Sequence, residues 1–200
     1  MSPNESRITQ QLDFLNEVEK LKLVFRRNRV VDRSRFENSA EHSWHIALMA
    51  IVLAEHADAG SLDVLRIVKM LLIHDLVEID AGDTWAYDTQ AQKKQPDNEE
   101  SAAARLFGML PAEQGAEFLD LWREFEARST PEAAFAASID ALQPLTNHLI
   151  SGEPEDPSLI PTKTAVLARK QHIAAASAAL WAQAQSTIET STEKGLYRNE

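Results

Sequence analysis

Apolar residues recur along this chain at the three- to four-residue spacing that is typical of amphipathic helices. The pattern predicts helices over the segments 8–26, 39–57, 61–80, 97–109, 113–128, 131–149 and 162–188. Glycine and proline fall mostly between these segments, and no alternating pattern bounded by hairpin turns predicts a strand. We therefore expect an all-α fold, in which residues 1–200 form one compact single-domain bundle of about seven or more helices.

The third predicted helix combines apolar character with ionisable groups. Residues 62–79 are apolar on almost every side, which is typical of a buried helix, yet they include His74 and Asp75. At about 100° per residue, Glu78 falls between these two in angle, one turn further on. Burying a carboxylate or an unpaired imidazole costs several kcal/mol unless a partner compensates. A bound cation is the simplest partner for His74 and Asp75 together.

Two other predicted helices supply groups of the right kind. The second helix begins near residue 39 and carries His42 and His45 on one face. The sixth helix carries Asp140 on the flank of its apolar stripe. His42, His74, Asp75 and Asp140 together offer two imidazoles and two carboxylates, a composition that suits a divalent first-row metal with open positions. We interpret His45 as a packed histidine that supports the site, not as a ligand.

The order of these groups resembles the HD-domain phosphohydrolase superfamily, and most closely its 5′-deoxynucleotidase-like branch. Residues 37–43 read E-N-S-A-E-H-S and lead into the first histidine, and Gly82-Asp83 follows the His-Asp pair. Asp140 opens the segment D-A-L-Q-P, and residues 195–198 (G-L-Y-R) resemble the ending of the family. The similarity spans roughly residues 12–150 and implies a helical bundle of the HD-domain type.

The resemblance also implies roles for individual residues. His42, His74, Asp75 and Asp140 match the metal ligands of the family. The two acids that act on water and on the leaving group in this branch match Glu78 and Asp83.

A further group in the branch binds the substrate phosphate. An arginine fifteen residues before the first ligand has this role there, and ungapped counting places Arg27 at its position, with Arg29 as an alternative. The branch carries a sugar-contacting tryptophan next to that arginine, whereas this chain has Asn28. The selectivity for deoxyribose over ribose is therefore expected to differ.

The activity that the resemblance implies is metal-dependent hydrolysis of (deoxy)nucleoside 5′-monophosphates to nucleoside and phosphate, by a homodimer. The metal is a divalent cation, for which Co, Mn, Mg, Zn, Fe and Ni all remain open. Two alternatives also remain. One keeps the metal site but acts on phosphodiesters or nucleoside triphosphates. The other is a non-catalytic helical protein with a structural metal, which would not require Glu78 and Asp83.

Composition narrows the class of partner. The chain has 31 acidic and 20 basic residues, a net charge of −11, which makes a nucleic-acid polymer a poor partner. A small phosphorylated ligand can still bind where a metal and arginines concentrate positive charge. There is no cysteine, and neither an apolar signal segment nor a run of membrane-spanning length is present. We therefore expect a cytoplasmic enzyme with no membrane partner.

Overall fold

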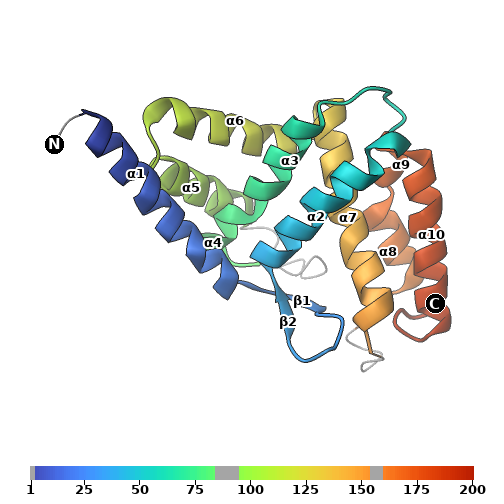
Figure 1. Cartoon of the computed structure of the whole chain (residues 1–200). Helices are drawn as coiled ribbons and strands as arrows, with labels where there is room; N and C mark the ends of the chain where they lie inside the picture. The colour runs from blue at the N-terminus through green and yellow to red at the C-terminus, as the bar shows by residue number, and fades with distance from the viewer. Residues whose placement is uncertain (1–2, 84–94, 154–159) are drawn as a thin grey trace.

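The computed structural model describes residues 3–83, 95–153 and 160–200, and these ranges are predominantly helical (Figure 1). The α-helices are α1 (Pro3–Val18), α2 (Ser39–Leu53), α3 (Val64–Ile73), α4 (Glu78–Ala81), α5 (Gln95–Phe107), α6 (Ala112–Ala127), α7 (Pro131–Ser151), α8 (Lys163–Lys170), α9 (Ile173–Ala176) and α10 (Ala178–Glu193). Short 3₁₀ segments are η1 (Glu19–Leu23), η2 (Ala54–His56) and η3 (His74–Val77). The expected all-α class is confirmed, apart from one small hairpin.

That hairpin corrects the expectation that the chain forms no strand. β1 (Phe25–Arg29) and β2 (Phe36–Asn38) pair antiparallel, so the first predicted helix ends well before residue 26. Phe25 pairs with Asn38 and Arg29 pairs with Phe36, which leaves two more residues in β1 than in β2 between these pairs. The bulge explains the failed prediction, because a polar segment of irregular register shows no period of two.

Helix α2 begins where its capping residues dictate. The side chain of Asn38 accepts a hydrogen bond from the Glu41 backbone amide at 3.0 Å, and the Glu41 carboxylate accepts one from the Asn38 amide at 2.8 Å. This reciprocal capping box satisfies two amides that the first helical turn leaves free. It also fixes the phase of α2, with His42 fully buried on the core side.

The third predicted helix is interrupted at its ionisable residues. α3 ends at Ile73, η3 continues as a 3₁₀ turn, and α4 starts at Glu78 with φ −67° and ψ −14°. In a 3₁₀ turn side chains three residues apart eclipse one another, whereas in an α-helix they diverge. Asp75 and Glu78 are three apart, so the tighter turn aims both carboxylates towards the same side.

The last predicted helix is also divided, into α8, α9 and α10. Ser177 has extended geometry (φ −160°, ψ 113°), and its hydroxyl donates to the His56 carbonyl at 2.6 Å while accepting from the Leu180 amide at 3.1 Å. Serine competes with helical hydrogen bonds in this way. The surrounding alanines favour helix, so the sequence alone did not reveal the break.

Helix α7 is the central element of the core. Figure 1 shows it between α2 and α3 on one side and the C-terminal helices on the other. Its buried apolar residues include Phe135, Ile139 and Leu145, and they pack with the fully buried Ile67 and Met70 of α3. The three elements predicted to carry ligands are therefore neighbours in one core.

Candidate metal centre

The structure brings the four predicted ligands together from α2, η3 and α7. His42 Nε2 lies 3.0 Å from Asp140 Oδ1, and His74 Nε2 lies 3.7 Å from the same oxygen. Candidate ligand atoms of His42, His74 and Asp140 all lie within 4.8 Å of one another. Asp75 adjoins this group, with Oδ1 2.9 Å from His74 Nε2 and Oδ2 3.9 Å from His42 Nε2.

The proton of His42 is positioned by a buried side-chain relay. The Gln143 amide nitrogen donates to Glu37 Oε1 at 2.9 Å, which turns the Gln143 oxygen towards His42 Nδ1 at 3.0 Å. Nδ1 must therefore carry the hydrogen, and Nε2 directs its lone pair at Asp140. Two acceptors at 3.0 Å need a proton or a metal cation between them. His45 Nδ1 lies 3.5 Å from Gln143 Nε2, which agrees with a packed role.

His74 is prepared in the same way from the other side. Its Nδ1 lies 3.0 Å from the Leu71 carbonyl oxygen, an acceptor that requires the hydrogen on Nδ1. The ring packs against Phe125 of α6, with centroids 4.7 Å apart. Nε2 is buried and makes no hydrogen bond to any residue in the described ranges. An orphaned imidazole nitrogen among carboxylates fits a metal ligand.

The pKa values show that positive charge is favoured here. Burial opposes a charged imidazole, yet the carboxylates of Asp75 and Asp140 raise the pKa of His74 well above its ordinary value. Burial would raise the pKa of Asp140, but the neighbouring imidazoles of His42 and His74 hold this pKa well below its usual range. A proton on His74, or a cation ligated by its Nε2, supplies the charge that these carboxylates require.

Glu78 and Asp83 lie at the edge of this group. Glu78 is buried, and the Ser39 hydroxyl donates to its Oε2 at 2.6 Å. Burial, with the nearby Asp75 carboxylate, raises the pKa of Glu78 well above its usual range. Gly82, at φ +77°, ends α4 and turns the chain so that Asp83 contacts Glu78, and burial raises the pKa of Asp83 too. Both acids therefore bind a proton more readily than the same groups do in water.

The sequence did not single out the arginine that reaches the cluster. Arg26 donates from Nη1 to Asp75 Oδ2 at 3.1 Å and has Nε 3.8 Å from Glu37 Oε2. Arg27 is exposed, and Arg29 is half-buried against the Phe36 ring at 4.6 Å. Five arginines occur between residues 26 and 35, and only the bulged register of β1 decides which one turns inward.

Asn28 makes hydrogen bonds to helix α7. Its Nδ2 donates to the Pro144 carbonyl at 2.9 Å and to Asn147 Oδ1 at 3.2 Å. These bonds tie β1 to α7 a few residues after Asp140. Asn28 is thus engaged by protein groups, and it is far smaller than a tryptophan. Residues 84–94, which follow Asp83 directly, lie outside the described part of the chain.

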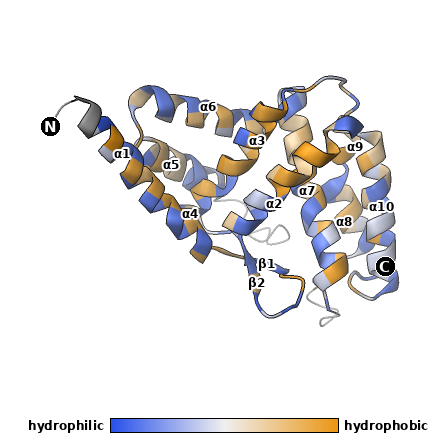
Figure 2. Ribbon diagram, in the orientation of Figure 1, coloured by the Kyte–Doolittle hydropathy of each residue, from blue (hydrophilic) through white to orange (hydrophobic). Residues whose placement is uncertain are grey.

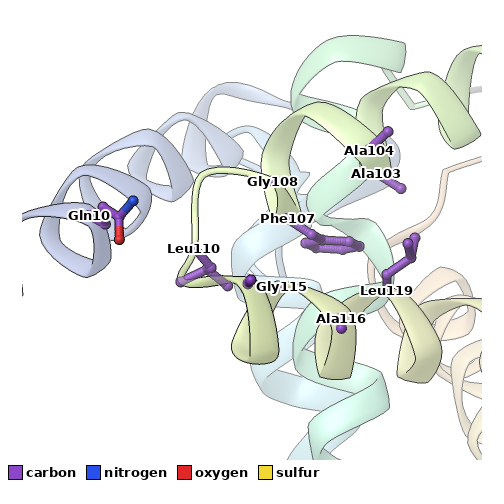
Figure 3. A pocket seen from close by; sticks show the side chains of 10 residues that line it. Gln10, Ala103, Ala104, Phe107, Gly108, Leu110, Gly115, Ala116 and Leu119 are labelled. Atoms are coloured by element: carbon purple, nitrogen blue, oxygen red, sulfur yellow. The ribbon is translucent and has the colours of Figure 1, made fainter. Parts of the chain in front are cut away.

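A separate hollow of about 540 Å³ lies between α1, α5 and α6 (Figure 3). Phe107, Leu110 and Leu119 line it together with alanines and glycines, and Gln10 approaches from α1. None of its lining residues titrates, so it offers no acid–base or metal chemistry. The buried ionisable cluster is the better candidate for a functional site.

Comparison with known proteins agrees with this geometry. Residues 18–181 match the family model of the HD domain. The human 5′-deoxynucleotidase HDDC2 is 32% identical over 130 residues, which are 64% of this chain and 62% of that protein. A 5′-deoxynucleotidase from Erwinia tasmaniensis is 32% identical over 136 residues, 64% of this chain and 68% of that protein. The chain thus spans only about three fifths of the length of HDDC2.

A solved structure is similar over nearly the whole chain. The crystal structure of a predicted metal-dependent phosphohydrolase from Magnetospirillum magnetotacticum MS-1 superposes with a TM-score of 0.87 and 44% identity, covering 96% of this chain and 98% of the other. The family match covers most of the sequence and includes α2, η3 and α7, the three elements that carry the four predicted ligands. The chain belongs to the HD domain family.

Proposed function

We propose that this protein is a metal-dependent phosphohydrolase that converts (deoxy)nucleoside 5′-monophosphates to nucleoside and phosphate. The observation that carries the proposal is the pair of buried imidazoles, each with Nδ1 directed at an acceptor and Nε2 directed at carboxylates. Such a pair with two carboxylates is a ligand set with open positions, typical of hydrolytic centres. His42, His74, Asp75 and Asp140 would hold the divalent cation. When bound, the cation supplies Lewis acidity that polarises a phosphoryl oxygen and acidifies water.

Two acids of the chain would move protons. Glu78, held by Ser39 at 2.6 Å, would orient or deprotonate the attacking water. Asp83, in contact with Glu78, would assist the leaving 5′-oxygen or share the role of base. Their raised pKa values bring both towards the range in which a group can accept and return a proton at neutral pH. A purely structural metal site has no need of such a pair.

A cation of the chain would hold the phosphate dianion. Arg26 is placed for this, because its guanidinium already lies 3.1 Å from Asp75 at the cluster. A planar guanidinium matches two phosphate oxygens at once and offsets the charge of the transition state. Arg27 and Arg29 remain predicted phosphate binders on the same strand.

The nature of the substrate is inferred from the relatives. Two of them are named 5′-deoxynucleotidases, and the similar solved structure is named a predicted metal-dependent phosphohydrolase. None of the helices in the described ranges has the length and apolar character needed to cross a bilayer. A small nucleotide substrate agrees with the names of these relatives. A cytoplasmic location remains part of the proposal.

The test is a matrix of metals and phosphorylated substrates. The purified chain is stripped with a chelator and reloaded with each of six divalent metals. Release of inorganic phosphate is then measured from ribo- and deoxyribonucleoside 5′-monophosphates. Hydrolysis of a monophosphate that depends on the metal supports the proposal. Hydrolysis of cyclic nucleotides, diesters or triphosphates alone would replace it with the alternative activity, and inactivity with every metal would leave a metal-binding protein.

We also propose that the active form is a homodimer. Figure 2 shows that α1, α2 and α3 carry many apolar residues. The exposed apolar side chains on these helices are Ile8, Leu12, Leu15, Trp44, Leu48, Ile51, Val52, Leu65 and Leu72. Trp44 is 62% exposed and Val52 is 61% exposed, which is unusual for residues of this size on a monomer. A two-fold partner presenting the same face would cover them.

A further inference from the structure

Lys170 is the last residue of helix α8, and its ammonium group is within electrostatic influence of Asp140. The side chain is half-buried, and it makes no hydrogen bond or ion pair with any residue in the described ranges. Two other lysines of the described ranges differ in this respect. Lys163, at the start of α8, pairs with Glu189, and Lys69 pairs with Glu117 at 2.7 Å. An ammonium group withdrawn from water without a partner is unfavourable, so its place needs an explanation.

The turn after α8, which follows Lys170, packs against α7 close to Asp140. His172 Nε2 lies 3.4 Å from the Ala137 carbonyl oxygen, and its Nδ1 lies 3.2 Å from the Arg169 carbonyl oxygen. Ala137 precedes Asp140 by three residues on α7, less than one helical turn. The His172 ring therefore fixes this turn against the segment of α7 that carries a predicted ligand.

The charges around Lys170 favour an anion. Burial, together with the positive charges of Arg169, Arg26 and Arg128, lowers the pKa of Lys170 to about 8 against the attraction of Asp140. Three guanidinium groups thus add to the positive charge felt by this ammonium, in a chain whose net charge is −11. Positive charge gathered at one place in an acidic protein attracts a small anion.

We propose that Lys170 is a substrate-binding residue, which holds the phosphate group at the cluster from α8 as Arg26 does from β1. The inference rests on the proposed function and adds a second cation to it. An ammonium is a compact donor that can approach a phosphoryl oxygen from any direction, whereas Arg26 is confined to one plane. The two would therefore bind different oxygens of the same dianion. A lysine that only covers apolar surface and extends into water would have no such effect.

The first experiment uses inorganic phosphate as the probe on the metal-loaded full-length chain. Lys170→Met is compared with Lys163→Met, a matched loss of one lysine charge from the same helix, and with Lys170→Arg. We expect the Kd for phosphate to rise about 10- to 100-fold in Lys170→Met, the range expected for a charge-assisted hydrogen bond. The arginine variant should stay within about 3-fold of the wild type, and metal affinity should be unchanged or tighter because a neighbouring positive charge is gone.

A second experiment needs no variant. Reductive methylation of the wild-type chain is followed by mass spectrometry with and without phosphate, and phosphate should protect Lys170 but not Lys163. Equal labelling of Lys170 in both samples, or a phosphate Kd in Lys170→Met no weaker than in Lys163→Met, would overturn the assignment. Phosphate binding that depends on Lys170 without phosphomonoesterase activity would refute the proposed function and leave the assignment standing.

Discussion

The relay behind His42 provides the sharpest test of the metal centre. Gln143→Leu keeps a similar volume but removes the acceptor for His42 Nδ1 and the donor to Glu37. His42 is completely buried, with 0% of its surface accessible to solvent, so water cannot replace the lost acceptor. The ring is then free to move its hydrogen to Nε2, which removes the lone pair directed at Asp140.

The magnitude follows from these losses. Partners of ligating histidines contribute about 10- to 100-fold to metal affinity, or about 1.4–2.7 kcal/mol. A buried donor left without an acceptor costs a further 1–3 kcal/mol or so in folding stability. Glu37 Oε2 already has no hydrogen-bond partner within the described residues. Loss of Gln143 would also remove the hydrogen bond to Glu37 Oε1.

The assay is a titration of the chelator-stripped chain with Mn²⁺ or Co²⁺, together with thermal unfolding. Gln185→Leu, an exposed position on α10, is the matched control. We expect Gln143→Leu to bind the metal about 10- to 100-fold more weakly and to unfold at a lower temperature, while the control is unchanged. A metal affinity within twofold or so of the wild type would refute the argument that Gln143 sets the tautomer of His42.

Four further outcomes are expected. Elemental analysis should find about one metal ion per wild-type chain and none in Asp75→Ala. An Asp75→Ala variant that keeps its ion would remove Asp75 from the ligand set. Glu78→Ala should keep the metal but lose about 10²- to 10⁴-fold in kcat, and normal turnover would exclude Glu78 from proton transfer. Because Asn28 is small and bonded to α7, the ratio of kcat/KM for dAMP over AMP should stay below about 10³, and a larger ratio would show that another residue excludes the 2′-hydroxyl. Light scattering should give a dimer mass that Ile51→Glu reduces to a monomer, whereas a monomeric wild type would contradict the dimer.

The sequence predicted the helices and the cluster because both depend on local patterns. Apolar periodicity marks α2, α3 and α7, and an ionisable pair inside an apolar helix is unusual enough to mark a site. Paired acceptors such as His42 Nε2 and Asp140 Oδ1, 3.0 Å apart, then agree with a cation site in the predicted place. The residue types alone carried that information.

What the sequence could not predict depends on backbone geometry or on distant contacts. The 3₁₀ turn at His74 leaves no distinct signature in an apolar segment. The contacts of Gln143 with Glu37 and of Arg26 with Asp75 join residues 106 and 49 positions apart. Counting along the chain identified Arg27, because no one-dimensional pattern reveals that β1 carries two extra residues between its pairings.

The bulge in β1 has a consequence for how the site tolerates error. The predicted ligands are one histidine on α2, the adjacent His74 and Asp75 on η3, and one aspartate on α7, so a shift of one residue would put a residue of another type at each position. The strand differs, because a slip of one residue would exchange Arg26 for the adjacent Arg27. A second arginine could therefore take over the proposed anion-binding role of Arg26. We expect this family to retain activity after insertions or deletions in the hairpin, but to lose it after the same changes in η3.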